Sequence, residues 1–262
     1  MEYQYIKVTV QDRIATITLN RPEVSNAFAK ESFIEVGDAV DLFSKDPDVG
    51  VVVITGEGKH FSAGGDIYSF RDRIERGEYI TEARVLNAAR MAVRIRRCEK
   101  PTIAMINGAA AGAGMSCALA CDFRVVQPSS RMSMAFINMG LPGDTLGIYH
   151  LIKLIGADRA ELLLMTGEPV RGEDCVKSGL ATIFAEEGKL QEETYALARK
   201  LAAKSMEGHM AQKRMINRFY YNQLDQFLLP EAEEMARCSR LPDFTEAVYA
   251  FLEKRSPVFN KN

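Results

Sequence analysis

The amino-terminal half of the chain alternates short apolar runs with longer segments of helical periodicity. The two earliest runs, at residues 6–10 and 14–19, are rich in β-branched residues and flank the polar turn 11–13, which predicts a β-hairpin. Further compact apolar runs, typical of buried strands, lie at residues 51–55, 102–106 and 123–126. Because helical patterns at 27–44, 71–97 and 112–121 separate these runs, the sequence predicts an α/β fold.

The carboxy-terminal part of the chain follows a different pattern. From residue 190 onward the apolar positions recur at helical spacing, with no strand-like run between them. The helical segments cover residues 191–205, 208–222, 231–237 and 244–254. We therefore predict a core over residues 1–195 and a C-terminal helical region over residues 196–262 that makes oligomer contacts.

Composition argues against several classes of partner. With 47% hydrophobic and 26% charged residues, the 262-residue chain has the balance of a soluble globular protein. A formal net charge of −2 gives no reason to expect nucleic acid or an anionic membrane as partner. The five cysteines show no metal-ligand spacing, so we expect reduced thiols and no metal site. No signal-peptide pattern and no run of membrane-spanning length is present, so we expect a cytoplasmic protein.

Two glycine-rich turns follow apolar runs and carry the candidate chemistry. FSAGGDI occupies residues 61–67 and NGAAAGAGMSCALACDF occupies residues 107–123. Glycine lets bare backbone N–H groups approach a ligand, because no Cβ stands in the way. Two such N–H groups that converge on one carbonyl oxygen form an oxyanion hole, which is often the largest single contribution to acyl chemistry. The turns could also merely permit tight packing of strand against helix.

These segments, taken in order, resemble the crotonase superfamily, the enoyl-CoA hydratase/isomerase family. The resemblance covers nearly the whole chain. Its segments are TLNRPEVSNAF (18–28), VVITGEGKHFSAGGDI (52–67), KPTIAMINGAAAGAGMSCALACDFRV (100–125), FINMGLPGDTLGIYHLIKLIG (136–156), MTGEPV (165–170) and EKRSPVF (253–259).

The resemblance implies a spiral of ββα units with a C-terminal helical trimerisation region, and so a homotrimer or a dimer of trimers. It also implies an acyl-CoA thioester as substrate, with no further cofactor. The N–H groups of Gly65 and Ala113 would form the oxyanion hole. Further residues would contact the substrate, namely Ala27, Ala63, Asp66, Ile67, Phe136 and Leu141.

The acidic positions of the family select the reaction. Family members place acids at three positions around the hole, which correspond here to Ser116, Phe136 and Asp144. Its hydratases use glutamates at the first two, because water addition needs groups that orient and deprotonate water. A lone Asp144 instead suits the transfer of a proton between two carbons. We therefore expect an isomerase that shifts a 3-enoyl thioester to the 2-enoyl form, with Asp144 in an apolar setting that raises its pKa.

Alternatives to this expectation remain open. Asp144 precedes a helical run, so it could serve as an N-cap rather than as a base. Another reaction of the same family, such as hydration, thioester hydrolysis or decarboxylation, could use Asp66 or Glu82 as its acid. The missing glutamates, and an alanine where the family usually has glycine in the hole, are also compatible with a non-catalytic acyl-CoA-binding subunit.

Overall fold

A six-stranded sheet forms the centre of the computed structural model, which describes residues 3–260. The predicted hairpin is confirmed: β1 (Ile6–Gln11) and β2 (Ile14–Leu19) pair antiparallel. From β2 onward the strands run parallel, in the order β1-β2-β3-β4-β6-β9. The other members are β3 (Val51–Gly56), β4 (Thr102–Ile106), β6 (Phe123–Val126) and β9 (Ile183–Phe184).

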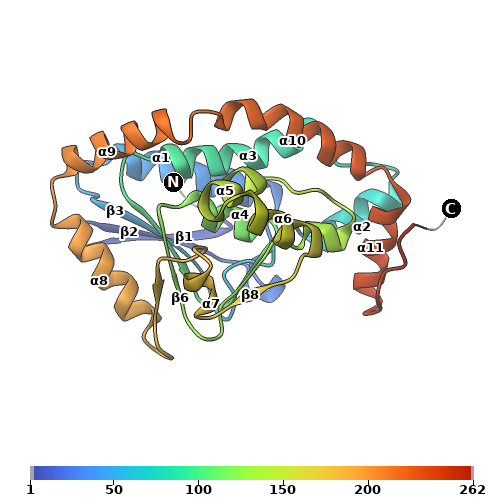
Figure 1. The fold of residues 1–262 in the computed structure, drawn as a ribbon, viewed down its shortest axis with the longest axis horizontal. Coiled ribbons are helices and arrows are strands. Elements are labelled where there is room, and N and C mark those ends of the chain that lie inside the picture. Colours follow the sequence, from blue (N-terminus) through green and yellow to red (C-terminus); the bar gives the residue numbers. More distant parts are fainter. Residues whose placement is uncertain (1–2, 261–262) are drawn as a thin grey trace.

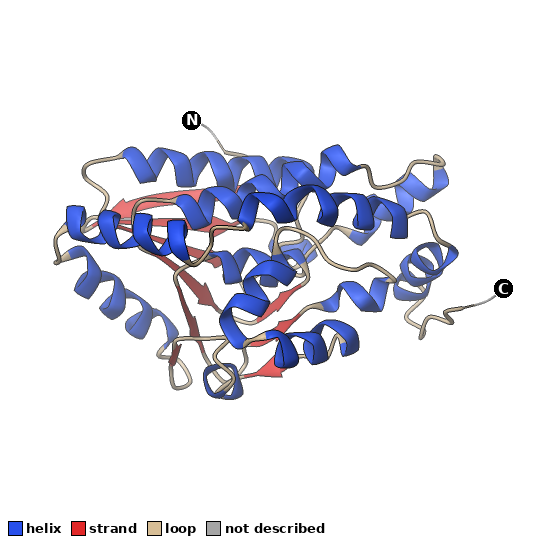
Figure 2. Cartoon of the chain, turned by 45° about the horizontal axis from the view of Figure 1, so that its top comes forward, coloured by secondary structure: helices blue, strands red, loops and turns tan. Residues whose placement is uncertain are grey.

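Helices cover both faces of this sheet, as its uniformly buried strands require. On one face, α1 (Lys30–Lys45) and α3 (Glu82–Arg97) pack over Val52 and Ile54 of β3. On the other face, α8 (Leu190–Ala202) packs against Val51 and Val53 of the same strand. Figure 2 shows the sheet enclosed between the two helical layers. Successive side chains of β3 therefore point to opposite faces of the sheet and pack into two separate apolar cores.

A small second sheet completes the strand–strand–helix units that the resemblance implies. It consists of β5 (Ala109–Ala111), β7 (Arg131–Ser133) and β8 (Val170–Arg171). After β4 the chain forms β5 and then α4 (Ala113–Ala120), and after β6 it forms β7 and the 3-10 helix η2 (Ala135–Met139). The predicted α/β architecture of stacked ββα units is confirmed.

The C-terminal helices lie against the core rather than apart from it. Figure 1 shows α10 (Leu224–Cys238) alongside α3, and α11 (Pro242–Leu252) beside α2 (Ile67–Glu75). The predicted division at 195/196 falls inside α8, so no element boundary marks it. The remaining helices are η1 (Pro22–Val24), α5 (Gly147–Ile155), α6 (Ala157–Thr166), α7 (Asp174–Lys177) and α9 (Met206–Phe219). Within residues 3–260 no helix combines the length and apolar character that crossing a membrane requires.

Two predicted helical segments differ from the structure in detail. Residues 71–97 are mostly helical, as expected, but they belong to two helices, because the N–H groups of Arg76 and Gly77 bond back to the carbonyls of Arg73 and Ile74 and close α2 there. The segment 231–237 begins seven residues too late, since α10 starts at Leu224 and continues through Pro230. A proline in a helix interior forfeits one hydrogen bond. Packing of α10 along α3 compensates for that loss.

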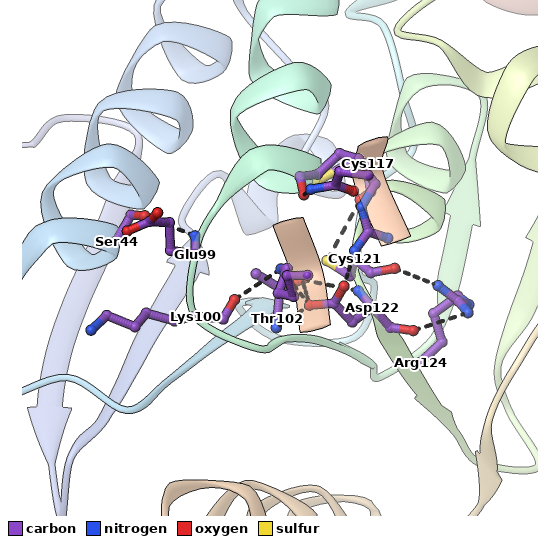
Figure 3. A network of polar contacts seen from close by, with 11 residues as sticks. Ser44, Glu99, Lys100, Thr102, Cys117, Cys121, Asp122 and Arg124 are labelled. Carbon is purple, nitrogen blue, oxygen red and sulfur yellow. Dashed lines mark hydrogen bonds and ion pairs between the residues drawn. The ribbon is translucent and has the colours of Figure 1, made fainter. Parts of the chain in front are cut away.

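A buried polar network around Asp122 ties the C-terminal region to the sheet through Lys213. Figure 3 shows the part of this network around Asp122 and Thr102. The Asp122 carboxylate accepts hydrogen bonds from the backbone N–H and the hydroxyl of Thr102, both on its Oδ2 atom. It also pairs with the Arg96 guanidinium from α3 and, at 2.6 Å, with the Lys213 ammonium from α9. The Lys213 side chain is only 8% exposed and that of Arg96 only 5%. One carboxylate therefore neutralises two buried cations.

Replacing Asp122 by asparagine should lower the free energy of unfolding by about 3–5 kcal/mol, because removal of one partner leaves buried charge uncompensated. Urea unfolding monitored by circular dichroism measures this loss. Asp225→Asn is a matched control, since Asp225 pairs with Arg97 at 2.6 Å through side chains that are 64% and 54% exposed. That control should change stability by less than about 1 kcal/mol. Equal effects of the two substitutions would contradict the role given to the buried network.

Candidate active site

A cavity of about 680 Å³ opens between the core and the C-terminal helices. Its wall combines residues of α2, α3 and η2 with Met235 of α10 and Phe251 of α11. All nine residues that the sequence nominates lie in this wall, namely Ala27, Ala63, Gly65, Asp66, Ile67, Ala113, Phe136, Leu141 and Asp144. The fold thus brings to one place residues that the sequence spreads over more than a hundred positions.

The two glycine turns lie directly against each other. The N–H of Ala111 donates to the carbonyl of Ser62 at 2.9 Å, so the second turn is hydrogen-bonded directly to the first. Gly64 has a φ of +91°, and a Cβ placed there would lie 2.6 Å from the carbonyl oxygen of Ala111 and 3.4 Å from the nitrogen of Ala113. Only glycine fits both the backbone conformation and the space. The Gly64–Gly65 peptide is therefore held beside the start of α4.

The N–H groups of Gly65 and Ala113 are available to a ligand in the cavity. In residues 3–260, neither donates a hydrogen bond to another protein group. Ala113 is the first residue of α4, so its N–H belongs to the set that a helix leaves unpaired at its start. The helix dipole adds partial positive charge at the same place. These two donors can receive negative charge that develops on a carbonyl oxygen.

Asp144 lies in a loop of unusual backbone conformation. The next two residues, Thr145 and Leu146, have φ values of 59° and 58°, which non-glycine residues seldom adopt. Helix α5 begins only at Gly147, with Leu146 as its N-cap and no side-chain capping bond. Asp144 therefore does not cap the helix. Within the described chain, its carboxylate accepts a single hydrogen bond, from the Thr145 hydroxyl at 2.8 Å.

The surroundings of Asp144 make it a stronger base than an ordinary aspartate. Its side chain faces a cavity wall that includes the apolar Phe136, Met139 and Leu141. This burial raises the pKa of Asp144 to about 6, and the hydrogen bond from Thr145 offsets only part of the effect. A carboxylate with a pKa near 6 is ionised at neutral pH and can still accept a proton effectively.

The other two acid positions of the family contribute packing and support instead of acids. The Phe136 ring lies over both loops: a Cβ at Gly112 would meet it at 3.7 Å and one at Gly143 at 3.6 Å. Ser116 is fully buried, and its hydroxyl donates to the backbone carbonyl of Asp144 at 3.1 Å. The Ser116 side chain on α4 therefore holds the backbone of the Asp144 loop through this hydrogen bond.

The alternative acids that the sequence offered are engaged elsewhere. Asp66 caps α2 by accepting from the N–H groups of Tyr68 and Ser69, and it pairs with Arg21 at 3.0 Å. Glu82 is exposed in the first turn of α3 and does not line the cavity. Of the three carboxylates that line the cavity, Glu23 is exposed and Asp66 is paired with Arg21, so Asp144 is the one that is both shielded from water and without a cationic partner in residues 3–260.

Sequence reasoning missed one buried acid near the site. Glu231 of α10 accepts hydrogen bonds from the N–H of Leu146, at 2.9 and 3.0 Å to its two carboxylate oxygens. The signal was present, since Glu231 stands seven residues after Leu224 and four before Met235, on the apolar stripe of the helix. It was overlooked because the helix predicted over residues 231–237 is too short to reveal this stripe.

The sheet of ββα units, the joined glycine turns and the apolar cavity are the arrangement of a crotonase-type fold. The chain belongs to the enoyl-CoA hydratase/isomerase family, whose model matches residues 9–262. It is similar to the trans-2-decenoyl-[acyl-carrier-protein] isomerase of Streptococcus mutans, with 32% identity over 260 residues and 99% of each chain covered. It is also 30% identical to the crotonyl-CoA hydratase of Syntrophomonas wolfei over 262 residues, again with 99% of each chain covered. Among solved structures, an enoyl-CoA hydratase from Mycobacterium avium subsp. paratuberculosis superposes with a TM-score of 0.90 at 26% identity, over 99% of this chain and 100% of the other.

Asp144→Asn should stabilise the protein at neutral pH by about 1–2 kcal/mol, because it removes a charge that the folded state disfavours. The folded pKa of about 6 exceeds the usual value of 3.8, so ionised Asp144 destabilises the fold as pH rises through this interval. The gain should therefore be small at pH ~4 and complete above pH ~7. Urea unfolding at both pH values measures it, with the exposed Asp48→Asn as control. A loss of stability at neutral pH would contradict the apolar setting of Asp144.

Proposed function

We propose that this protein is an enoyl thioester isomerase that moves a carbon–carbon double bond between the 2,3 and the 3,4 positions of the acyl chain. The observation that carries the proposal is the desolvated carboxylate of Asp144, which faces the cavity and has no cationic partner in residues 3–260, beside two N–H groups that are unpaired in the same residues. Proton transfer between neighbouring carbons needs one base and one oxyanion site, and nothing more.

The reaction balances with these groups alone. The thioester carbonyl oxygen accepts hydrogen bonds from the N–H groups of Gly65 and Ala113. In the direction from 3-enoyl to 2-enoyl, the Asp144 carboxylate takes a proton from C2, and the electron pair moves into a dienolate whose negative charge lies on that oxygen. The protonated Asp144 then returns the proton to C4, and the double bond forms between C2 and C3. The reverse direction exchanges the roles of C2 and C4.

Hydration by the family's two-glutamate mechanism is the second candidate, and the side chains at its two positions disfavour it. Ser116 is buried and bonded to backbone carbonyls, and Phe136 covers the glycine loops with an apolar ring. Neither can orient and deprotonate water. The similarity to an isomerase from Streptococcus mutans supports double-bond migration, while the similarity to hydratases keeps hydration as the competing activity to measure. A non-catalytic acyl-CoA-binding subunit would need no base, so the raised pKa of Asp144 argues against that alternative.

The carrier of the acyl group and the assembly of the chains belong to the same proposal. An acyl-CoA is the expected substrate, and the relative from Streptococcus mutans makes the acyl-carrier protein the alternative to test. The homotrimer or dimer of trimers stays a prediction. Exposed apolar side chains on α9, Met215 and Phe219 at 55% and 73% exposure, support it as contacts between chains.

Asp144→Asn should lower kcat for isomerisation of a 3-enoyl-CoA by about 10²–10⁴-fold, the usual effect of removing a general base. In the wild type, kcat/KM should fall below pH ~6, because the base must be ionised in the free enzyme. Product analysis by chromatography separates 2-enoyl from 3-hydroxyacyl thioesters. Glu82→Gln is the control and should retain full activity. An active Asp144→Asn variant, or a wild type that hydrates without isomerising, would overturn the proposal.

Ala113→Pro should remove one oxyanion donor while the helix is kept, since proline is tolerated at the first position of a helix. We expect kcat to fall by about 10²–10³-fold, as for the loss of one donor in other acyl enzymes. Ala157→Pro is a matched control, because Ala157 also opens a helix after a glycine N-cap but is exposed and far from the cavity wall. Wild-type kcat in a folded Ala113→Pro variant would show that this N–H does not stabilise the oxyanion.

A further inference from the structure

The carboxyl group of Glu231 is buried, which is unusual for an acidic side chain and calls for a specific role. It reaches from α10 into the protein interior, where the residue is 7% exposed, and both of its oxygens lie within 3.0 Å of the Leu146 nitrogen. A glutamate is almost never fully buried without a partner for its charge. In residues 3–260 no cation pairs with it. Its one hydrogen-bond partner is the loop that carries Asp144.

That loop needs an external support. Thr145 and Leu146 both have left-handed backbone conformations, and such conformations persist only where the surroundings enforce them. Ser116 anchors the loop at the carbonyl of Asp144, on the side of α4. Glu231 anchors it two residues later, on the side of the C-terminal helix. Without Glu231, the buried N–H of Leu146 would have no acceptor among the described residues.

No cation offsets the charge of Glu231 within residues 3–260. Three arginines of α3, against which α10 packs, are paired with other acids: Arg94 with Asp38 and Asp41, Arg96 with Asp122, and Arg97 with Asp225. The other two arginines of α3 form no ion pair with Glu231 in the described residues. On α5, burial lowers the pKa of His150 to about 3, so this residue is neutral at working pH. Burial and the Asp144 charge together raise the pKa of Glu231 well above its usual range, so its hydrogen bond to the loop is its one stabilising polar contact in residues 3–260.

We propose that Glu231 is a positioning residue of the active site: from the C-terminal helix it fixes the loop that presents Asp144 to the cavity. Glu231 does not line the cavity and touches no substrate, so it acts only through the loop. The inference rests on the proposed function for its kinetic consequence, but its structural part concerns the Leu146 N–H alone.

Two substitutions test the hydrogen bond to the loop. Glu231→Gln keeps a carbonyl acceptor for the Leu146 N–H. Glu231→Leu keeps much of the volume and removes the acceptor. The same changes at Glu233, which is exposed on the same helix, give matched controls that should leave activity unchanged. Hydrogen–deuterium exchange of a peptide that covers residues 143–150 reports on the loop, and steady-state kinetics with a 3-enoyl-CoA report on Asp144.

For Glu231→Leu we expect faster exchange in this peptide and a kcat lower by about 10²-fold, because small displacements of a catalytic group have effects of this size. Its KM should change by less than about threefold, since the cavity and the oxyanion donors remain. Glu231→Gln should exchange like the wild type and keep kcat within about threefold.

Two results would overturn the proposal. A Glu231→Leu variant with wild-type kcat and exchange would show that the loop does not need the carboxyl group. A Glu231→Gln variant as impaired as Glu231→Leu would show that hydrogen-bond acceptance is not the role. If the wild type does not isomerise, the proposed function fails, while the exchange data still decide whether Glu231 holds the loop.

Discussion

The close approach of the two glycine turns is the constraint on which the rest of the site depends. A Cβ at Gly114 would lie 2.6 Å from the carbonyl oxygen of Ser62, so α4 can pack onto the first turn only without a side chain at that position. The backbone of Ser62 is bonded on both sides, to Ala109 and to Ala111, which makes the two turns one rigid unit. The direction in which the Gly65 and Ala113 N–H groups point follows from this contact. A ligand carbonyl that accepts from both N–H groups would therefore lie at this junction.

With a ligand carbonyl at this junction, the apolar side chains of the cavity wall would determine which reaction the site can support. Phe136 spans the Gly112 and Gly143 loops and excludes polar groups from the region where a second acid could stand. Desolvation by these apolar walls raises the pKa of Asp144, and so gives a single aspartate the basicity that proton abstraction from carbon requires. The same desolvation destabilises the fold at neutral pH, which is the usual relation between an active-site charge and stability.

The sequence predicted the strands and the glycine turns well because both rest on local rules. The apolar runs that became β3, β4 and β6 are buried on both faces, and their bounds differ from the prediction by at most one residue. The orientation of Asp144 could not be predicted, since a residue just before a helix caps it as readily as it faces a cavity. That choice depends on the left-handed conformations of Thr145 and Leu146, which neither residue type favours by itself. Glu231 was missed because the predicted helix began only at residue 231. Packing on α3 keeps residues 224–230 helical although Pro230 lies among them.

The position of Glu231 changes how the C-terminal helices should be understood. The sequence suggested a layer devoted to contacts between chains, yet α10 supplies Met235 to the cavity wall and Glu231 to the Asp144 loop, and α11 supplies Phe251. The C-terminal region is also anchored to the core by the buried pairing of Lys213, on α9, with Asp122. Because the loop that carries Asp144 is bonded to Ser116 of α4 and to Glu231 of α10, its conformation depends on the packing of both parts of the chain. Substitutions that loosen the C-terminal helices should therefore displace Asp144 through α10, even where the N–H groups of Gly65 and Ala113 stay in place.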